Sequence, residues 1–404
     1  MDLAAHPYRS QIRLLLTTAL ILFVFTVVIG ILNGTDVVDF DRKVLLTHVH
    51  VGTLAWITLS VFASTLWLFT DHLLEGRLDS WARFGAPLAA GTILAYDLTF
   101  LTTTGWFRPA LGSVAAAVIV GWFLWAVALA RTAEVSVPQW GLLAALATSV
   151  TGGLLGVLYG ILIASPETKV LPAGGEDAHP ATMVVGFLVP VGMALVEWWL
   201  RPDEARTRAT GAGFSQMALL FLGGFTLMLG VLLDAMALIT LNLPFEIIAV
   251  GIFLRRNWAS LRSVGWGNGR PPPFLAAATV AIVWDLGMLV YLISKYADDF
   301  DAAPDRLLLA LDHVMFVGVL TNALFAQLRA ATRARADVLG WADRVVFLLV
   351  NIGLAGFWLG LVIDEAWPKR AFTPLMGVGI LLGVGVFLAR LQADRQPVPD
   401  PAPA

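Results

Sequence analysis

Histidine is the residue type in this sequence best suited to cofactor chemistry, and only six histidines occur among its 404 residues. Four stand at the start of apolar stretches: His48 and His50 in LLTHVHVGTLAWI, His179 in EDAHPATMVVGFL and His313 in LALDHVMFVGVL. Polar groups within such stretches are rare in membranes and usually functional. Because a neutral imidazole can bind a metal through one ring nitrogen, these four are the candidate ligands.

The other two histidines have polar surroundings. His72 stands in FTDHLLEGR and His6 in the short polar segment before the first apolar stretch, so we expect both at the wet interface. The chain has no cysteine, which excludes disulfides, thiolate catalysis, iron–sulfur ligation and c-type haem attachment on it. Redox chemistry would therefore use His, Met or carboxylate ligands.

Imidazoles from two separate helices can approach an iron porphyrin from opposite faces and fix a low-spin, redox-active iron. Zinc or copper would require three or four such ligands. His48 and His50 are two positions apart, roughly 200° around a helix, so we expect one to be a ligand and the other to bond outward. The alternative for any one histidine is a simple hydrogen bond to a neighbouring carbonyl.

The elements that must position these residues are transmembrane helices. The chain is 58% apolar and 14% charged, whereas soluble domains are nearer a quarter charged. Uncharged runs of about twenty residues predict membrane spans. The expected spans are Leu14–Leu32, Val44–Thr70, Phe84–Thr104, Ala110–Ala130, Trp140–Ala164, Ala181–Leu200, Ser215–Leu233, Met236–Leu254, Pro273–Ser294, Leu307–Ala326, Val345–Val362 and Phe372–Ala389.

One boundary is ambiguous, because Ser215–Leu254 is nearly continuous in its apolar character. A helix of about forty residues would far exceed a ~30 Å hydrocarbon core, so we divide the stretch at Asp234. Asn242 and Pro244 are the alternative place for a turn or kink.

The expected fold is an all-α polytopic integral membrane protein of about twelve helices. A single transmembrane domain, 14–392, follows a cytoplasmic segment, 1–13, and precedes a disordered Pro-rich cytoplasmic tail, 393–404. Most of the 26 Lys and Arg residues fall in alternate connecting segments, and the preference of basic residues for the cytoplasmic side places both termini inside the cell (plasma or inner) membrane. The four candidate histidines then share its outer half.

Twelve helices with histidines early in the second, sixth and tenth, and the segment HVHVGTLAW above all, resemble the catalytic subunit I of the haem-copper oxidase superfamily. The likeness is greatest to its nitric-oxide-reductase and cbb3-type branch and to the haem- and copper-containing membrane proteins of the nitric-oxide response. This resemblance implies a low-spin bis-His haem b on His313 and on His50 or His48. It also implies copper or non-haem iron on His179, and haem propionates held by Lys369 and Arg370.

The chain departs from that family at three places. The seventh span has no histidine, Leu311 stands where the family has its high-spin haem ligand, and Met183 replaces a Tyr or Glu four residues after His179. A binuclear centre for dioxygen or nitric oxide is therefore incomplete. We expect a haem-binding relative that transfers electrons or handles a small gas (O2 or NO), with copper or a second haem as further candidate cofactors and catalytic turnover left open.

The partners implied are the lipid bilayer and, by resemblance, oxidase subunits or an electron donor of a respiratory chain; nothing suggests nucleic acid. A third possibility is a structural or assembly protein that holds haem or copper for an oxidase.

Aromatic residues near the span ends, including Trp106, Trp198, Trp199 and Trp367, are expected at the membrane interfaces.

Carboxylates within the apolar spans favour a competing function, a secondary transporter or channel. They are Asp97, Glu197, Asp234, Glu246 and Asp285, and such groups mark proton or cation routes. We expect Glu197 and Asp234 to reach water at helix ends. Asp97 and Asp285 lie deeper and are the ones a transporter would use.

Overall fold

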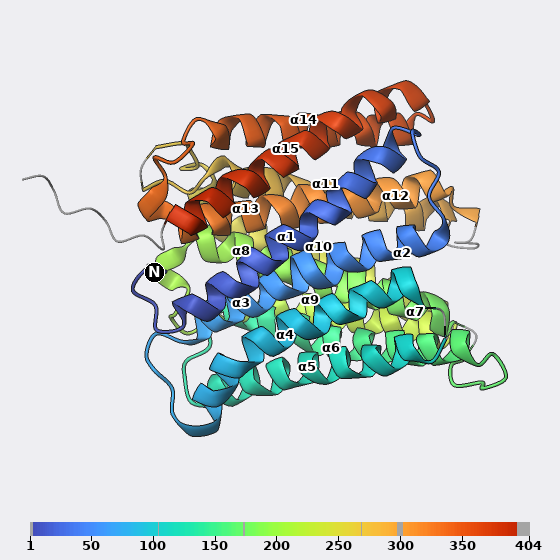
Figure 1. Ribbon diagram of the computed structural model, residues 1–404, viewed down its shortest axis with the longest axis horizontal. Coiled ribbons are helices and arrows are strands. Elements are labelled where there is room, and N and C mark those ends of the chain that lie inside the picture. Colours follow the sequence, from blue (N-terminus) through green and yellow to red (C-terminus); the bar gives the residue numbers. More distant parts are fainter. Residues whose placement is uncertain (1–2, 104, 173, 268, 297–301, 394–404) are drawn as a thin grey trace, which may run out of the picture.

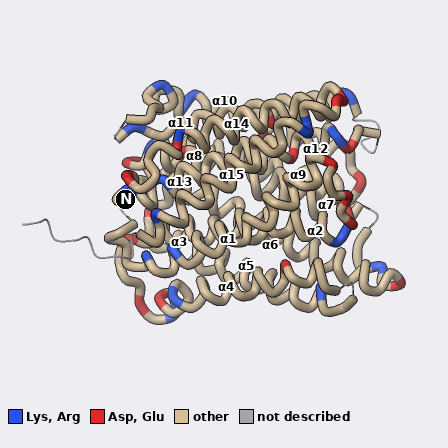
Figure 2. The backbone as a smooth tube through the Cα atoms, turned by 45° about the horizontal axis from the view of Figure 1, so that its top comes forward, with Lys and Arg blue, Asp and Glu red and all other residues tan. Residues whose placement is uncertain are grey.

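The computed structural model describes residues 3–393 except 104, 173, 268 and 297–301. In this part every regular element is helical, and twelve helices are long and apolar enough to cross a membrane. Figure 1 shows them packed side by side, and Figure 2 shows most Lys, Arg, Asp and Glu at the two ends of the bundle. A hydrocarbon layer favours a middle with few charged residues, so the predicted all-α polytopic membrane fold and its helix count are confirmed.

Nine spans are continuous α-helices and three contain a π-helical segment. In chain order the described spans are α1 (Arg9–Gly34), α2 (Arg42–His50) with η1 (Val51–Thr58) and α3 (Leu59–Phe69), α4 (Gly76–Thr102), α5 (Phe107–Ala130), α6 (Val137–Ala164), α7 (Gly175–Ala181) with η2 (Thr182–Leu188) and α8 (Val189–Leu200), α9 (Gly211–Leu232), α10 (Met236–Leu261), α11 (Pro273–Tyr296), α12 (Asp305–His313) with η5 (Val314–Thr321) and α13 (Asn322–Ala331), α14 (Ala342–Val362) and α15 (Ala366–Ala393). Two short 3-10 helices, η3 (Pro202–Glu204) and η6 (Arg333–Arg335), lie in the connections after α8 and α13. Of the predicted disordered tail, residues 394–404 lie outside the described residues.

The long apolar stretch turns where the sequence predicted. Helix α9 ends at Leu232 and α10 begins at Met236, with Asp234 exposed and in the left-handed backbone region at φ 51°. Asp tolerates that region better than most residues because its short polar side chain can bond locally. Pro244, the alternative turn, lies inside α10.

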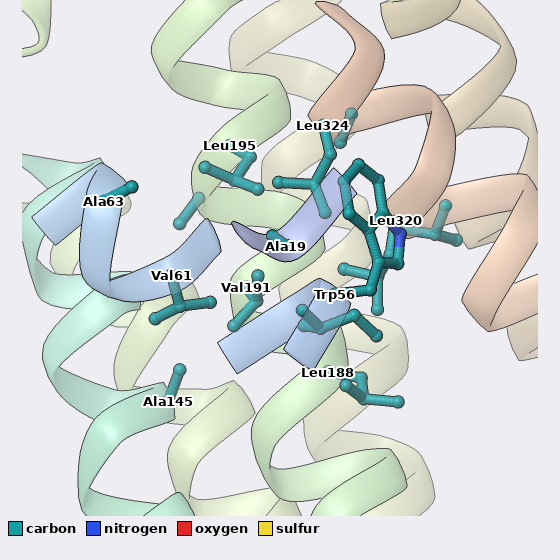
Figure 3. Close-up of a cluster of buried hydrophobic side chains, with 14 of the residues drawn as sticks. Ala19, Trp56, Val61, Ala63, Ala145, Leu188, Val191, Leu195, Leu320 and Leu324 are labelled. Atoms are coloured by element: carbon teal, nitrogen blue, oxygen red, sulfur yellow. The ribbon is translucent and has the colours of Figure 1, made fainter. Parts of the chain in front are cut away.

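The second, sixth and tenth spans form the interior of the bundle. Their apolar windows are 100%, 83% and 67% buried, whereas the other nine spans are 28–50% buried. Figure 3 shows Trp56, Leu188 and Leu320, one from each inner span, within one apolar cluster. The indole Nε1 of Trp56 also donates to Thr321 Oγ1 at 3.4 Å. The inner spans are therefore positioned mainly by contact with one another and with the outer helices.

The sequence V-G-x-L recurs once in the π-helical segment of each inner span. It stands at Val51–Leu54, Val185–Leu188 and Val317–Leu320, at nearly equal intervals along the chain. The chain thus consists of three successive units of four helices, each with its inner helix second.

The glycines of the repeat lie against the helix that precedes each inner span. A methyl group at Gly52 would be 3.5 Å from Thr26 of α1, and one at Gly318 only 2.8 Å from Ala281 of α11. Helix α9 approaches even more closely, since a methyl at Gly224 would be 2.4 Å from the backbone of Gly186. Small residues permit such contacts between membrane helices.

This close packing predicts that Gly224→Ala destabilises the protein by about 1–3 kcal/mol, because the backbone of η2 must move aside. Gly287→Ala in α11 is the matched control, since no described atom lies within 4 Å of the added methyl. It should be neutral or stabilising by up to about 1 kcal/mol. Thermal unfolding in detergent measures both, and equal effects of the two substitutions would contradict the assignment.

Candidate functional site

The four histidines of the apolar stretches lie at one end of the bundle, which we call the histidine end. Figure 1 shows α2, α7 and α12 together there, opposite the N-terminus. The π-helical segments begin directly after His50 and His313 and three residues after His179. Single π-helical turns within α-helices occur frequently at functional sites, and here all three inner helices have one next to a histidine.

Each of the four imidazoles makes the same kind of hydrogen bond. Nδ1 lies 2.8–2.9 Å from a backbone carbonyl oxygen, that of Thr26, Leu46, Gly152 and Leu309 for His48, His50, His179 and His313 respectively. A carbonyl can only accept, so Nδ1 carries the proton and Nε2 keeps its lone pair. No residue in the described part of the chain bonds any of these Nε2 atoms.

This pattern is the one that histidines bound to metals adopt, with one ring nitrogen donating to a carbonyl and the other free to ligate. A buried histidine needs a hydrogen-bond partner for its N–H group. Here the backbone carbonyl that Nδ1 contacts is that partner. All four side chains are half-buried. Their Nε2 atoms therefore form the set of donors from which a cofactor site can be built.

His48 and His50 face different neighbours, as their angular separation on a helix predicts. His48 lies against α1, where a methyl group at Gly30 would be 3.3 Å from its Cε1. His50 stacks on Phe100 of α4, with ring centroids 3.8 Å apart and planes at 24°. The two imidazoles cannot serve the same metal from these positions.

Charge interactions connect these histidines two by two across helices. His313 is close enough to His48 for their charges to interact, and His50 is similarly close to His179. His313 also packs on Phe357 of α14 at 4.7 Å. Among the described residues no group of three His, Asp or Glu side chains could hold a metal ion.

The basic pair expected to hold propionates is already in an ion-pair cluster. Lys369 Nζ and Arg370 Nε lie 2.7 and 2.8 Å from the carboxylate of Asp36, in the turn after α1. These hydrogen bonds lower the pKa of Asp36. Two cations and one carboxylate leave this cluster with a net positive charge.

The buried carboxylates fall into two classes. Asp97 is 3% exposed and neither of its oxygens has a partner in the described part, and the same holds for Oδ1 of Asp285. Glu246, also buried, accepts a bond from Asn242 at 3.4 Å. Asp97 and Asp285 are therefore deep, as predicted, and Asp234 is exposed.

Glu197 does not reach water, contrary to the sequence-based expectation. It is buried and lies 2.7 Å from Arg256 of α10, and it also accepts a bond from Gln216 at 3.1 Å. Arg256, which lies on another helix, neutralises the Glu197 carboxylate, so this carboxylate does not require contact with water. The hydropathy of a single helix could not indicate this pairing. Trp198 was likewise expected at an interface but is fully buried, stacked on Trp199.

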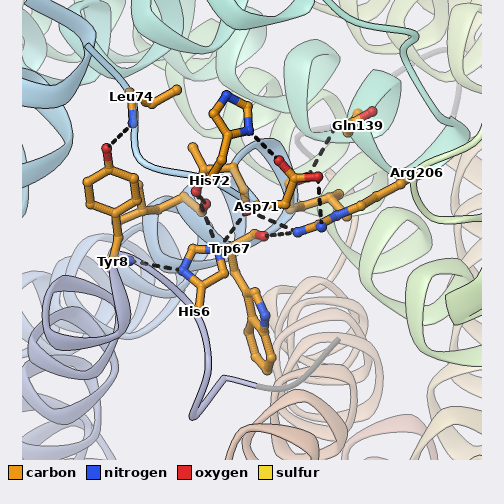
Figure 4. Close-up of polar contacts among 11 residues, drawn as sticks. His6, Tyr8, Trp67, Asp71, His72, Leu74, Gln139 and Arg206 are labelled. Carbon is orange, nitrogen blue, oxygen red and sulfur yellow. Dashed lines mark hydrogen bonds and ion pairs between the residues drawn. The ribbon is translucent and has the colours of Figure 1, made fainter. Parts of the chain in front are cut away.

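The opposite end of the bundle carries a separate polar network (Figure 4). Arg206 donates to the carbonyls of Trp67 and Thr70, and Gln139 donates to that of Leu68. These are carbonyls in the last turn of α3, which have no partner within the helix. The network is therefore a helix cap.

His6 belongs to this network, and the expectation that it is wet is wrong. It is 8% exposed, its Nε2 donates to Thr70 O at 2.7 Å, and its Nδ1 accepts from the backbone N–H of Tyr8 at 3.2 Å. His72 is exposed, as expected, and lies beside Asp71. The residues around His6 are polar, which favoured a solvent-exposed position. They gave no sign that the N-terminal segment packs against the end of α3.

Two residues beside the second histidine pair were missed from the sequence. Phe100 stacks on His50, and Arg108 of α5 lies buried over the Phe100 ring at 4.7 Å. Arg108 stands between two predicted spans, where basic residues are common, and only its packing distinguishes it. Neither a protein-family model nor a curated protein sequence matches this chain, so the site is interpreted from its own geometry.

The buried cap predicts a pH dependence of stability. Burial and the nearby Arg206 lower the pKa of His6 below 6.5, so the folded state favours the neutral ring. Protonation would add an N–H group at Nδ1, which would then face the backbone N–H of Tyr8 and lose the hydrogen bond between them. The stabilisation is complete above about pH 6.5 and is lost as pH falls from there through the folded-state pKa.

Thermal unfolding of the wild type and His6→Gln between about pH 7.5 and 5.5 tests this, around the ordinary His pKa. The wild type should lose more stability on acidification than His6→Gln, which cannot titrate at this position. His72→Gln, at an exposed site, should retain the wild-type slope. An unchanged slope in His6→Gln would refute the assignment.

Proposed function

We propose that this chain is a haem-binding protein of the cell membrane, with both termini cytoplasmic, in which His48 and His313 are the axial ligands of a low-spin haem b. Its function is to transfer electrons or to handle a small gas, O2 or NO, as the resemblance to haem-copper oxidase subunit I implies. The observation that carries the proposal is the matched state of the two imidazoles, protonated at Nδ1 and free at Nε2, on neighbouring inner helices.

The choice of His48 over His50 rests on their neighbours. His48 is the member of the pair near His313, and its Nδ1 donates to a carbonyl of a different helix, which fixes the ring relative to α1. His313 is held by Leu309 O on its own helix and by Phe357. Rings fixed in this way can present Nε2 to an iron without a further change of rotamer.

The donor set fits haem better than a bare metal ion. Two neutral imidazoles are a complete set of axial ligands for a porphyrin iron, whereas zinc and copper sites commonly use three or four ligands, and no such group exists in the described part. When bound, the haem would supply a one-electron redox couple. Lys369 and Arg370 would hold its propionates, with Asp36 orienting both cations.

The protein around the two ligands would exclude water from the haem and hold each imidazole in one orientation. The apolar core around Trp56 and Leu320 (Figure 3) excludes water beneath the site. The Thr26 carbonyl keeps the His48 proton on Nδ1. Ligands fixed from two helices above an apolar core are suited to electron transfer, because little has to rearrange when the charge changes.

A reduced-minus-oxidised spectrum of the detergent-purified protein tests the proposal. We expect b-type bands, and we expect His48→Ala and His313→Ala to lose the same bands, because each removes one axial ligand of one haem. His72→Ala is the control, since that exposed imidazole is far from the site.

A colourless wild-type protein after expression with ample haem would refute haem binding altogether. Different bands missing from the two variants would refute the pairing of His48 with His313. Where the protein is coloured as expected, mixing with O2 and with NO shows whether it handles either gas.

A second candidate function, proton-coupled transport, is favoured by one observation. The buried carboxylates of Asp97 and Asp285 have oxygens without any partner in the described part, and such groups take up and release protons or cations in transporters. Asp285 also lies close enough to Glu246 and Asp312 for charge interaction, so carboxylates of three helices are near one another.

Proteoliposomes with an internal pH-sensitive dye test this alternative. If it holds, the wild type dissipates an imposed pH gradient, and Asp285→Asn slows this to the rate of empty vesicles, whereas Asp234→Asn at the exposed turn does not. A wild type no faster than empty vesicles would rule out proton transport.

A further inference from the structure

Arg108 is a buried cation without a counter-ion. Only 8% of its surface is exposed, and its guanidinium donates to the carbonyl oxygens of Phe100 and Thr103. Nε has no partner, and no carboxylate in the described part of the chain pairs with it. An uncompensated charge inside a protein is expensive. This position therefore favours an anionic ligand.

Phe100 connects this arginine to the second histidine pair. Its ring lies 4.7 Å from the guanidinium carbon of Arg108 and 3.8 Å from the imidazole centroid of His50. Both residues thus share one aromatic neighbour on α4. An anion bound to Arg108 would lie beside the imidazole of His50.

Helix α6 brings His179 to the same place. A methyl group at Gly156 would be 2.7 Å from His179 Cε1, and one at Gly160, the next turn of the helix, 3.3 Å from Pro109, the residue after Arg108. One turn spans only about 5.4 Å. His50 is correspondingly close enough to both His179 and Arg108 for charge interaction.

We propose that His50 and His179 are the axial ligands of a second iron porphyrin, and that a carboxylate of this porphyrin pairs with Arg108. The two free Nε2 atoms supply the ligands, Arg108 supplies the cation, and Phe100 supplies an aromatic wall. A bare copper or zinc ion fits less well, because the arginine would repel it and only two ligands are present. The site is independent of the proposed function, since it uses neither His48 nor His313.

Haem content by pyridine haemochrome, per chain of purified protein, tests the proposal. We expect about two haems in the wild type and about one in His50→Ala and in His179→Ala, because each haem needs both of its axial ligands. His48→Ala should also retain about one haem, but in this variant the retained haem is the second one. His50→Ala and His179→Ala should lose the same absorption bands, those of the second haem. His48→Ala should lose different bands, those of the first haem.

The outcomes separate this site from the first one. Haem loss in the His50 and His179 variants alone would support the second site and refute the first, and loss in the His48 and His313 variants alone would do the reverse. Copper found by elemental analysis and lost with His179→Ala, without any loss of haem, would also overturn the porphyrin assignment. Because these variants could misfold, His50→Gly and His179→Gly are to be supplied with imidazole, which should restore the missing haem.

Arg108→Gln tests the anion partner by a property other than haem content. Both haems should remain, and the midpoint potential of the second should fall, because losing a nearby positive charge favours the oxidised iron. The first haem should change less. Arg83→Gln, at an exposed ion pair with Asp79, should change neither potential. An unaltered potential of the second haem in Arg108→Gln would overturn the role of the arginine.

Discussion

A polar group inside a hydrocarbon layer has to find its partner within the protein, because no water is available there. The twelve helices satisfy the backbone in this way. Where the inner helices widen into π-helical turns, threonine hydroxyls take up carbonyls five residues back, Thr58 bonding Thr53 O and Thr321 bonding Phe316 O, each at 2.9 Å. The ion pair of Glu197 with Arg256 follows the same constraint between two helices.

The same constraint fixes the candidate ligands. Each of the four imidazoles at the histidine end gives its Nδ1 proton to a backbone carbonyl, and this leaves one lone pair per ring. The glycine of the repeated V-G-x-L sequence lets each inner helix pack closely against the helix that precedes it. The histidines stand at different distances before the repeat glycine, so they point to different neighbours, and two pairs result rather than one cluster.

Some of the groups that escape the constraint suggest a function. Arg108 Nε, both carboxylate oxygens of Asp97 and Oδ1 of Asp285 are buried without partners in the described part. Most buried polar atoms in folded proteins are bonded, so each exception needs an explanation. A porphyrin carboxylate would account for Arg108, and proton exchange would account for the acids. These explanations are compatible, since a membrane haem protein can also need a route for protons.

The sequence by itself determined the membrane class, the helix count, the turn at Asp234 and the placement of four histidines on three helices. These follow from properties of single segments, such as apolar length, charge and the position of a residue along one helix. It could not determine that His48 lies near His313 while His50 lies near His179, that Arg108 is buried beside Phe100, or that His6 and Glu197 are enclosed. Those depend on which helix packs against which, and side-chain surroundings set by contacts between distant segments leave no signal within either segment.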